Sequence, residues 1–369
     1  MSAHFFDLDR DQLVAFMQEH GFRTFVADQL LRWVYQRGEV DLDRMTDLSR
    51  GDRARLATLM EFERAEELTR QAASDGTRKL LLGWTPDRTG DDAASSLPLL
   101  APPSRKETEC VMIPTEDRKT ACISSQVGCP VGCRFCASGL GGLEGNLTRG
   151  KIVEQAWRLG RLPGVERISN VVFMGMGEPL ANYGNVIGAI RTLNAPWGLG
   201  IGARRITVST VGLPAAIRRL AEFELPVTLA LSLHAPNDEL RREIIPWAEH
   251  ATIKEILDAC SSYFKATGRE ITLEYILLGS FNDQAEHARE LAGVAGSLRA
   301  NVNLIRYNEV EGLPFRRPVS ADVHRFQSIL REQGINAHIR ASRGRDIDAA
   351  CGQLRHKERP DPRPPVTEQ

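Results

Sequence analysis

The chain has 369 residues, of which 42% are hydrophobic and 26% are charged, and its formal net charge is −1. This length suffices for a large core and a smaller domain, since domains typically hold about 100 to 200 residues. A membrane protein is excluded because no run of about 18 apolar residues occurs. The acidic start of the chain also lacks a secretory signal pattern, so we expect a cytoplasmic protein.

A small helical domain is predicted for residues 1–63. Apolar residues recur at helical spacing after Asp9 and again before Gly38, and Leu48-Ser49 is placed to cap a third helix. These helices share one apolar face, which is expected to form their common core.

Residues 64–114 are predicted to form a β connector between two domains. Lys79–Trp84 and Glu109–Pro114 have the composition of extended segments that form a hairpin or a small sheet. The stretch around 86–106 is rich in Asp, Ser, Gly and Pro. It cannot bury enough apolar surface to order itself, so we expect a flexible insertion there.

Strands and helices alternate from residue 115 to 356, which predicts an α/β domain with a parallel sheet and outer helices. The expected fold is a partial (β/α)6 TIM-like barrel, followed by a disordered tail at 357–369. The predicted strands are Ala121–Ser125, Val171–Met174, Ile206–Ser209, Val227–Ser232, Ile271–Leu277 and Val302–Tyr307. The predicted helices are Ile152–Leu159, Val186–Leu193, Leu213–Phe223, Ile253–Phe264, Ala285–Leu298 and Val323–Glu332.

Three cysteines, Cys129, Cys133 and Cys136, follow the first of these strands at spacings of four and three, among Gly and Pro residues. A four-iron cluster is normally held by one thiolate per iron, so three cysteines would leave one iron open. A structural zinc site is the alternative, but it needs four ligands, usually in two pairs, and no second pair follows. A disulfide framework does not suit a long chain with an odd seven cysteines.

The other motifs fall where predicted strands end, and in parallel α/β folds active sites gather at that edge. Gly175 and Gly177 allow a ligand to approach the backbone closely, and Glu178 offers a carboxylate to an ammonium group. Ser209, Ser232-Leu233-His234 and Asn308 end later strands. A lone His such as His234 is more often a satisfied core residue, but its place at a strand end favours a binding role.

Basic residues are concentrated between Leu140 and Leu220 and again from Arg340 to Arg359. Such patches can neutralise phosphates, although charge runs are also common on solvated helix faces.

The Cys-x3-Cys-x2-Cys pattern, with Phe135 before its last cysteine, resembles the signature of radical S-adenosylmethionine enzymes. Further segments are similar to the RlmN family and extend the resemblance from about residue 20 to about residue 355. They are Ser124–Cys129, Phe173–Pro179, Ser232–Pro236 and Asp346–Leu354. Members of that family methylate carbon 2 of an adenine in 23S ribosomal RNA and in the anticodon region of transfer RNA.

The resemblance implies a [4Fe-4S] cluster on the three cysteines and S-adenosylmethionine at the open iron. The residues implied to bind S-adenosylmethionine are Gly177, Glu178, Ser209, Ser232, Leu233, His234 and Asn308, with Phe135 near its adenine. The N-terminal domain would help to hold RNA, which makes Arg23, Arg32, Arg37 and Arg44 candidate phosphate contacts; surface solubility is an equal explanation for them.

The resemblance also implies two S-adenosylmethionine molecules per turnover and a methylcysteine intermediate at Cys351. Glu109 is the candidate base, and Cys122 is the candidate thiol that resolves a protein–RNA adduct by forming a disulfide with Cys351. Cys110 and Cys260 are interpreted as structural. The expected partners are 23S rRNA, tRNA and an electron donor such as flavodoxin, and the expected state is a monomer.

Two other functions remain open. A Cfr-type enzyme uses the same machinery on carbon 8 of adenine, but the 346–354 and 303–308 segments are closer to RlmN. Arg306 departs from that pattern, since Pro is expected there in many relatives. A non-catalytic iron–sulfur RNA-binding protein would not need Cys122 and Cys351.

Overall fold

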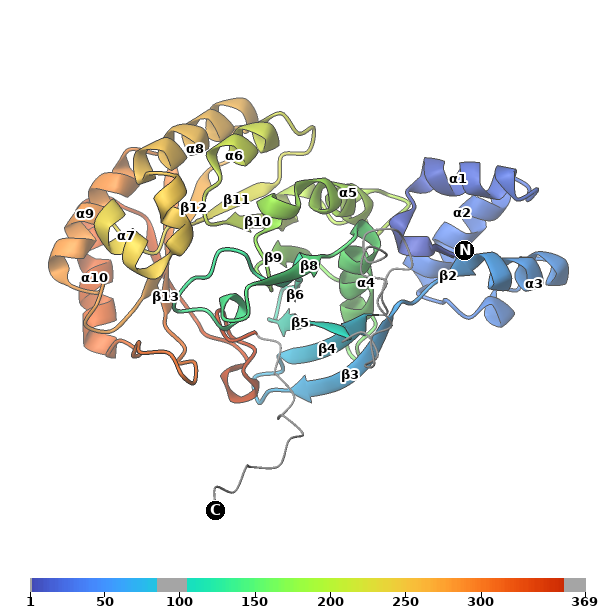
Figure 1. Ribbon diagram of the computed structural model, residues 1–369, viewed down its shortest axis with the longest axis horizontal. Coiled ribbons are helices and arrows are strands. Elements are labelled where there is room, and N and C mark those ends of the chain that lie inside the picture. The colour runs from blue at the N-terminus through green and yellow to red at the C-terminus, as the bar shows by residue number, and fades with distance from the viewer. Residues whose placement is uncertain (1, 85–104, 355–369) are drawn as a thin grey trace, which may run out of the picture.

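The computed structural model describes residues 2–84 and 105–354, and its centre is one ten-stranded sheet (Figure 1). The strand order is β14-β13-β12-β11-β10-β9-β6-β5-β4-β3, with β14 and β3 as the two edges. The parallel strands are β6 (Lys119–Cys122), β9 (Asn170–Phe173), β10 (Ile206–Thr210), β11 (Thr228–Ser232), β12 (Ile271–Leu277), β13 (Ala300–Arg306) and β14 (Ala337–Arg340). The six predicted strands and the partial barrel are confirmed, and β14 adds a seventh parallel strand.

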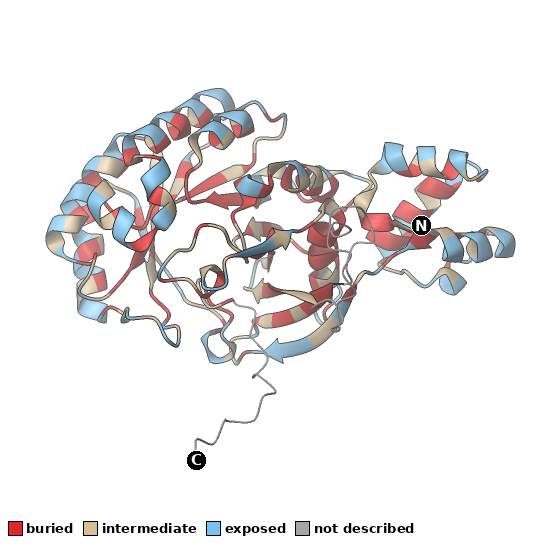
Figure 2. Cartoon of the chain, in the orientation of Figure 1, coloured by how far each residue is buried: buried red, intermediate tan, exposed pale blue. Residues whose placement is uncertain are grey.

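Helices follow the parallel strands and cover the outside of the sheet, with exposed outer faces and buried inner faces (Figure 2). They are α4 (Arg149–Gly160), α5 (Tyr183–Asn194), α6 (Pro214–Ala221), α7 (Asp238–Ile244), α8 (Ile253–Thr267), α9 (Ala285–Gly296) and α10 (Ser320–Glu332). Within the described residues, no helix has both the length and the apolar character needed to cross a bilayer.

Residues expected to form a separate connector instead extend the main sheet. β5 (Lys106–Pro114) pairs antiparallel with β6, and β4 (Arg78–Trp84) and β3 (Ala65–Ala72) follow it outward. The two strands predicted for the connector do pair with each other, and they continue the main sheet. Apart from Arg105 and Lys106, the predicted insertion lies outside the described residues, as does the predicted tail.

The N-terminal helices are α1 (Arg10–Glu19), α2 (Phe25–Leu31) with a π-helical extension to Arg37, and α3 (Arg50–Leu59). Asp9 caps α1 in a capping box, because its side chain accepts from the Gln12 amide while Gln12 accepts from the Asp9 amide. The predicted cap of α3 is also present, since Ser49 accepts from the Asp52 amide. Two short strands, β1 (Ala3–His4) and β2 (Met60–Glu61), pair beside these helices.

A buried polar cluster joins the N-terminal part to the barrel helix α4. His4 is 2% exposed and its ring nitrogens lie 3.4 Å from Asp7 Oδ2 and 3.2 Å from Glu154 Oε2. The Asp7 carboxylate also accepts from the Gly150 amide at 2.6 Å, and Glu154 accepts from the Ala65 amide at 3.0 Å. These charge-assisted contacts fix the N-terminal residues against the start and middle of α4.

Candidate active site

The three motif cysteines lie on one loop between the short paired strands β7 (Gln126–Gly128) and β8 (Leu143–Asn146). Gly132 has a φ of 68°, which lets the loop curl back on itself. The Cys129 amide donates to the Gly142 carbonyl at 2.8 Å, and the Cys136 amide donates to the Cys133 carbonyl at 3.1 Å. The loop is thus closed at its base and holds all three thiols together.

The three thiols lie in largely apolar surroundings. They pack against an apolar cluster that includes Val131, Phe135 and Val211. In the ranges that the structure describes, no three His, Cys, Asp or Glu side chains converge tightly enough for one ion. A four-iron cluster binds each sulfur to a different iron, so its ligands stand farther apart than those of one zinc ion. Three thiols that each bind a different iron would leave the fourth iron without a protein ligand.

Burial raises the pKa of the three thiols, with Cys129 reaching about 12. Nearby Cys136 adds to the rise for both Cys129 and Cys133, which reflects how close the three sulfurs are. Thiolates are the form that binds iron, so cluster assembly at this loop would release protons.

The loop after β9 packs directly on the residues that follow β6. A Cβ at Gly175 would lie 2.6 Å from Ser124 Oγ, and one at Gly177, whose φ is 103°, would lie 2.6 Å from Gln126 Cβ. Gln126 Oε1 also accepts from the Glu178 amide at 2.8 Å. Position 177 thus requires glycine for both its conformation and the available space. The next residue, Glu178, lies beside the loop that holds Cys129, Cys133 and Cys136, called the cluster loop below.

The Glu178 carboxylate is buried and joins two strand ends. Its oxygens accept from the Leu180 amide at 2.9 Å and the Val211 amide at 2.8 Å. Burial nevertheless raises the pKa of Glu178 to about 7, because these hydrogen bonds offset only part of the lost hydration. A cation that reached this carboxylate would therefore favour its charged form.

Two serines meet where adjacent strands β10 and β11 end: Ser209 Oγ lies 3.1 Å from Ser232 Oγ. Leu233 follows Ser232, but its side chain is fully buried in the main core. Its amide donates to the Glu274 carbonyl, and its carbonyl accepts from Arg241 Nε. A ligand would meet Leu233 only through its main chain.

His234 has a φ of 62°, in the left-handed region that residues other than glycine rarely adopt. Burial lowers the pKa of His234 to about 3, so the ring is neutral. Nδ1 accepts from the Ile276 amide at 3.2 Å, which leaves the proton on Nε2. The ring also packs edge-on against Phe135, with ring centroids 5.0 Å apart. The neutral imidazole therefore presents a donor and an aromatic edge beside the cluster loop.

Asn308 follows β13 and is 3% exposed. Its Oδ1 accepts from Arg317 at 3.0 Å, and the same guanidinium nitrogen donates to the Tyr307 carbonyl. The side-chain oxygen is thus held by a cation, which leaves the amide nitrogen as a donor.

Cys122 and Glu109 lie on the face of the sheet opposite the one that α4 covers. Lys79 of β4, Val111 of β5 and Cys122 of β6 form one row of paired positions across the three strands. Glu109 precedes Val111 by two residues and so points to the same face. Lys79 Nζ lies 2.9 Å from Glu109 Oε1.

The C-terminal segment lies along this face and brings Cys351 to it. Ala349 and Leu354 pack with Val111 and Cys122. At the other side, the Gly352 carbonyl accepts from the Ala137 amide at 2.8 Å, next to Cys136 of the cluster loop. The segment therefore lies between the cluster loop and Cys122.

The residue Cys351 is exposed to solvent. Desolvation of its thiol by the surrounding protein, followed by repulsion from the Glu274 carboxylate, raises the pKa of Cys351 to about 11. Burial raises the pKa of Cys122, and the neighbouring Cys351 raises it further. All seven cysteines lie in the described part of the chain and are free there, so the expected disulfide is not formed in this state.

Three charged residues near this site were not predicted from the sequence. Lys79 is 4% exposed, Arg241 is 1% exposed and Glu274 is 7% exposed. Arg241 donates to the carbonyls of Leu233 and Val211, which ties α7 to two strand ends. The available sequence signal was a charged residue inside an otherwise apolar strand, as with Lys79 before Leu80-Leu81-Leu82.

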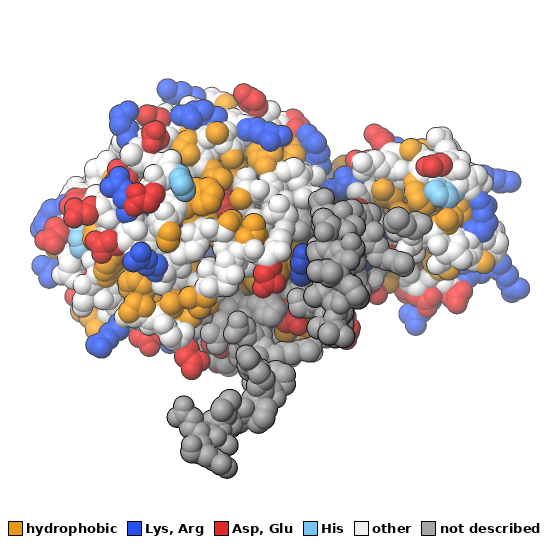
Figure 3. All heavy atoms as spheres, viewed as in Figure 1, with side chains coloured by type: hydrophobic (Ala, Val, Ile, Leu, Met, Phe, Trp, Pro, Cys, Tyr) orange, Lys and Arg blue, Asp and Glu red, His pale blue; other side chains and the backbone are white. Residues whose placement is uncertain are grey.

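The four arginines suggested as RNA contacts are exposed on the N-terminal helices, where Figure 3 shows Lys and Arg side chains along the outer edge. The Arg37 guanidinium stacks 4.0 Å from the Trp33 ring centroid, and that of Arg23 lies 5.9 Å from the Phe25 ring centroid. Arg32 and Arg44 instead pair with acidic side chains. Arg23 and Arg37 are therefore the better candidates.

Two protein-family profiles match separate parts of the chain. Residues 3–62 match the "ribosomal RNA large subunit methyltransferase N-terminal domain", and residues 123–292 match the radical SAM superfamily. The cluster loop and the strand ends up to β12 lie within the second match.

Several named proteins are similar over almost the full chain. A probable dual-specificity RNA methyltransferase RlmN from Rhodopirellula baltica is 44% identical over 95% of this chain and 90% of its own length. The protein of the same name from Gloeobacter violaceus is 43% identical over 94% of this chain and 93% of its length. The crystal structure of a radical SAM methyltransferase from Sphaerobacter thermophilus matches with a TM-score of 0.88 and 40% identity, covering 95% of this chain and 99% of that chain.

Proposed function

The chain belongs to the RlmN family of radical S-adenosylmethionine RNA methyltransferases, and from this premise we propose that it methylates carbon 2 of adenine in 23S rRNA and in tRNA. The observation that carries the proposal is the C-terminal segment, which lies between the cluster loop and Cys122. Cys351 would receive the methyl group on the side of the cluster loop and would pass it to the RNA on the side of Cys122.

The chemistry of the base explains why such an arrangement is needed. Carbon 2 of adenine is electron-poor and its hydrogen is barely acidic, so an ordinary transfer from a sulfonium finds no nucleophile. Cofactors rather than side chains carry radical steps of this kind. When bound, a four-iron cluster on Cys129, Cys133 and Cys136 with S-adenosylmethionine supplies the methyl group, a radical that removes a hydrogen atom, and a sink for one electron.

The residues at the strand ends hold S-adenosylmethionine. The Glu178 carboxylate accepts from its ammonium group, and the hydroxyls of Ser209 and Ser232 bind its polar atoms. The Nε2–H of His234 and the amide of Asn308 are further donors, and Phe135 lies near the adenine. Gly177 keeps the backbone close, and Leu233 contributes only main-chain atoms.

Cys351 carries the methyl group to the RNA. Its thiolate would accept the methyl group of a first S-adenosylmethionine, so that a new S–CH3 bond forms while the sulfonium–CH3 bond breaks and S-adenosylhomocysteine leaves. A second S-adenosylmethionine would supply the radical that takes a hydrogen atom from this methyl group, and the carbon held on the Cys351 sulfur would then bond to carbon 2 of the adenine. One electron and the carbon 2 proton must then leave, and Glu109 accepts the proton.

Cys122 releases the product. Its thiolate attacks the Cys351 sulfur, so that an S–S bond forms and the S–CH2 bond breaks. The bonding electron pair goes to the methylene carbon, which takes up a proton and becomes the new methyl group. An external electron donor such as flavodoxin would supply electrons to the cluster. Thiols from outside the protein would reduce the disulfide between Cys122 and Cys351. The enzyme acts as a monomer in the cytoplasm.

The proposal is tested by anaerobic reaction of the reconstituted protein with 23S rRNA fragments, tRNA, reductant and methyl-labelled S-adenosylmethionine. Nucleoside mass spectrometry is expected to find the label in 2-methyladenosine from both RNAs. Label in 8-methyladenosine would instead support a Cfr-type activity. No label in RNA would support a non-catalytic RNA-binding protein.

A further inference from the structure

Lys79 lies between the candidate base and the segment that carries Cys351. Its Nζ is 2.9 Å from Glu109 Oε1 and 3.1 Å from the carbonyl oxygen of Asp348, three residues before Cys351. The side chains of Lys79 and Glu109 are only 5% and 9% exposed. One ammonium group thus contacts two parts of the site that are 239 positions apart in sequence, Glu109 and Asp348.

We propose that Lys79 is a positioning residue for the step that resolves the protein–RNA adduct, an inference that rests on the proposed function. By holding the Glu109 carboxylate and the Asp348 carbonyl on one ammonium group, Lys79 sets the position of the base relative to Cys351.

The geometry of the ammonium group supports this role. Lysine has three donors and no acceptor, so one Nζ can hold a carboxylate and a carbonyl at the same time. Loss of Lys79 would remove one compensating charge from the buried Glu109 carboxylate.

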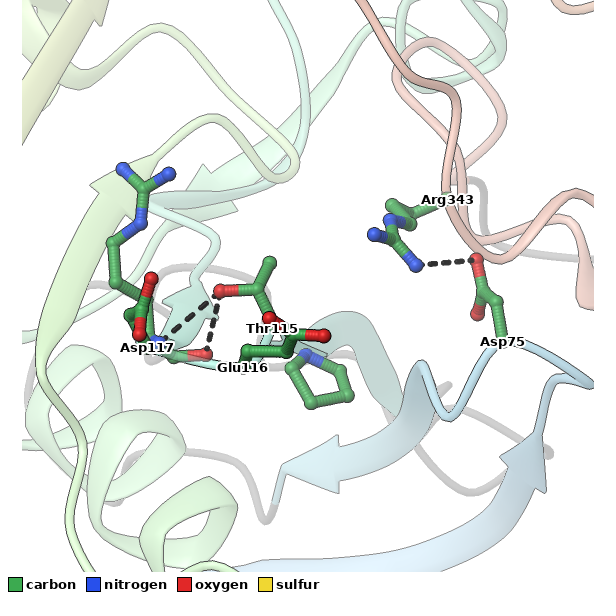
Figure 4. A pocket seen from close by; sticks show the side chains of 7 residues that line it. Asp75, Thr115, Glu116, Asp117 and Arg343 are labelled. Carbon is green, nitrogen blue, oxygen red and sulfur yellow. Dashed lines mark hydrogen bonds and ion pairs between the residues drawn. The ribbon is translucent and has the colours of Figure 1, made fainter.

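The β3–β4 turn provides separate anchors for the same segment. Asp75 accepts from the Gly344 amide at 3.0 Å, and the Ser74 amide donates to Asp346 at 2.9 Å. Asp75 also forms an ion pair of 4.0 Å with Arg343, and the two line a surface cavity of about 560 Å³. They lie together on one side of that cavity, with Thr115, Glu116 and Asp117 on the other (Figure 4). Because the turn already holds residues 343–346, loss of Lys79 is expected to remove its contacts with Glu109 and Asp348 without detaching the whole segment.

The sheet itself does not require a charge at position 79. The main-chain pairing of β4 with β5 is made by backbone groups, and Leu80 and Leu82 on the opposite face are fully buried in the main core. Lys79→Met keeps a long aliphatic side chain and removes only the charge and the donors. A step-specific defect in this variant would therefore report on positioning rather than on folding.

The experiment compares Lys79→Met, Lys79→Arg, Glu109→Gln and the Lys79→Met/Glu109→Gln double variant in single-turnover reactions. Two quantities are followed: methylation of Cys351 in the absence of RNA, and decay of the covalent protein–RNA adduct. Lys119→Met is the matched control, since Lys119 Nζ also donates to a main-chain carbonyl, that of Thr115, but outside the site.

We expect Lys79→Met to methylate Cys351 at the wild-type rate but to resolve the adduct about 10-fold or more slowly, within the range that general-base catalysis contributes. Lys79→Arg is expected to recover most of that loss, because it restores the charge. The double variant should be no slower than Glu109→Gln alone, since both changes act on one base. Lys119→Met should match the wild type.

Wild-type adduct decay in Lys79→Met, or equal slowing of both steps, would overturn the inference. Independent, multiplicative losses in the double variant would do the same. If Lys79→Met loses iron or its thermal transition, Lys79→Gln, which keeps a donor without charge, is measured in its place with the same criteria. Failure of the wild-type protein to form 2-methyladenosine would instead overturn the proposed function.

Discussion

The amide of Ala137 donates to the carbonyl of Gly352 over 2.8 Å, which joins the residue after Cys136 to the residue after Cys351. Ser138 Oγ adds a second contact, 2.5 Å from the Leu354 carbonyl. The last candidate cluster ligand and the candidate methyl carrier are therefore held together by two neighbouring hydrogen bonds. Their spacing depends on local contacts rather than on the barrel as a whole.

Ser138→Ala is expected to weaken this junction. The change removes a buried hydrogen bond and leaves the Leu354 carbonyl without that donor, at a cost of about 1 kcal/mol. Methylation of Cys351 should slow, because the C-terminal segment is held less firmly beside the cluster loop. The measurement is the rate of label transfer to the Cys351 peptide. Ser262→Ala should leave that rate unchanged, because the Ser262 hydroxyl donates to the Asp258 carbonyl on the exposed face of α8.

Gly177→Ala is expected to destabilise the loop that carries Glu178. Its φ of 103° and a Cβ only 2.6 Å from Gln126 Cβ together predict a loss of about 1 to 3 kcal/mol in the free energy of unfolding. Affinity for S-adenosylmethionine, measured by calorimetry, should fall as well. Gly184→Ala is the matched control: it has open space in α5, and the helix should gain up to about 1 kcal/mol. Unchanged stability in Gly177→Ala would contradict the close packing described for this loop.

The contribution of His4 to stability should depend on pH. Burial opposes its charge, but Asp7 and Glu154 outweigh that effect and raise the pKa of His4 above 6.5. A raised folded-state pKa means that the stabilisation is complete below about pH 6.5, the unfolded-state pKa, and is lost as the pH rises through the folded value. His4→Gln should therefore destabilise the protein more at pH 6 than at pH 9 in denaturant titrations. An equal effect at both values would show that the His4 charge adds nothing.

Arg37→Ala is expected to weaken RNA binding with little effect on catalysis by bound RNA. If Arg37 contacts one phosphate, the slope of log affinity against log salt should fall by about one. Lys254→Ala serves as the control, because Lys254 is 87% exposed on α8, in the barrel. Equal effects of the two changes on the salt slope would indicate general electrostatics rather than contact with the N-terminal helices.

Much of the fold could be predicted because several of its parallel strands consist mostly of buried residues. β12, for example, is observed at Ile271–Leu277 as predicted, and all but one of its residues are buried. β14 and β3 were missed because both are edge strands. β14 has only four residues with alternating exposure, and β3 carries Glu, Thr, Arg and Gln on largely exposed positions. Short or polar edge strands lack the apolar run that identifies a core strand.

The candidate site was predictable as a set of motifs but not as an arrangement. The sequence placed Cys129, Cys133 and Cys136 on one loop, because their spacing is local. It could not show that Lys79 would contact Glu109, since that contact depends on β4 pairing with β5 in one particular register. The position of Cys351 beside Cys122 likewise depends on a segment that returns from the far edge of the sheet.

The central claim is that Cys351 carries the methyl carbon to RNA and that Cys122 releases it. Its most direct test is mass spectrometry of Cys122→Ala protein after reaction with RNA, S-adenosylmethionine and reductant. We predict a stable covalent complex in which the Cys351 sulfur is joined through one methylene carbon to carbon 2 of an adenine. Free methylated RNA released by Cys122→Ala at the wild-type rate, or a complex linked through another residue, would contradict the account.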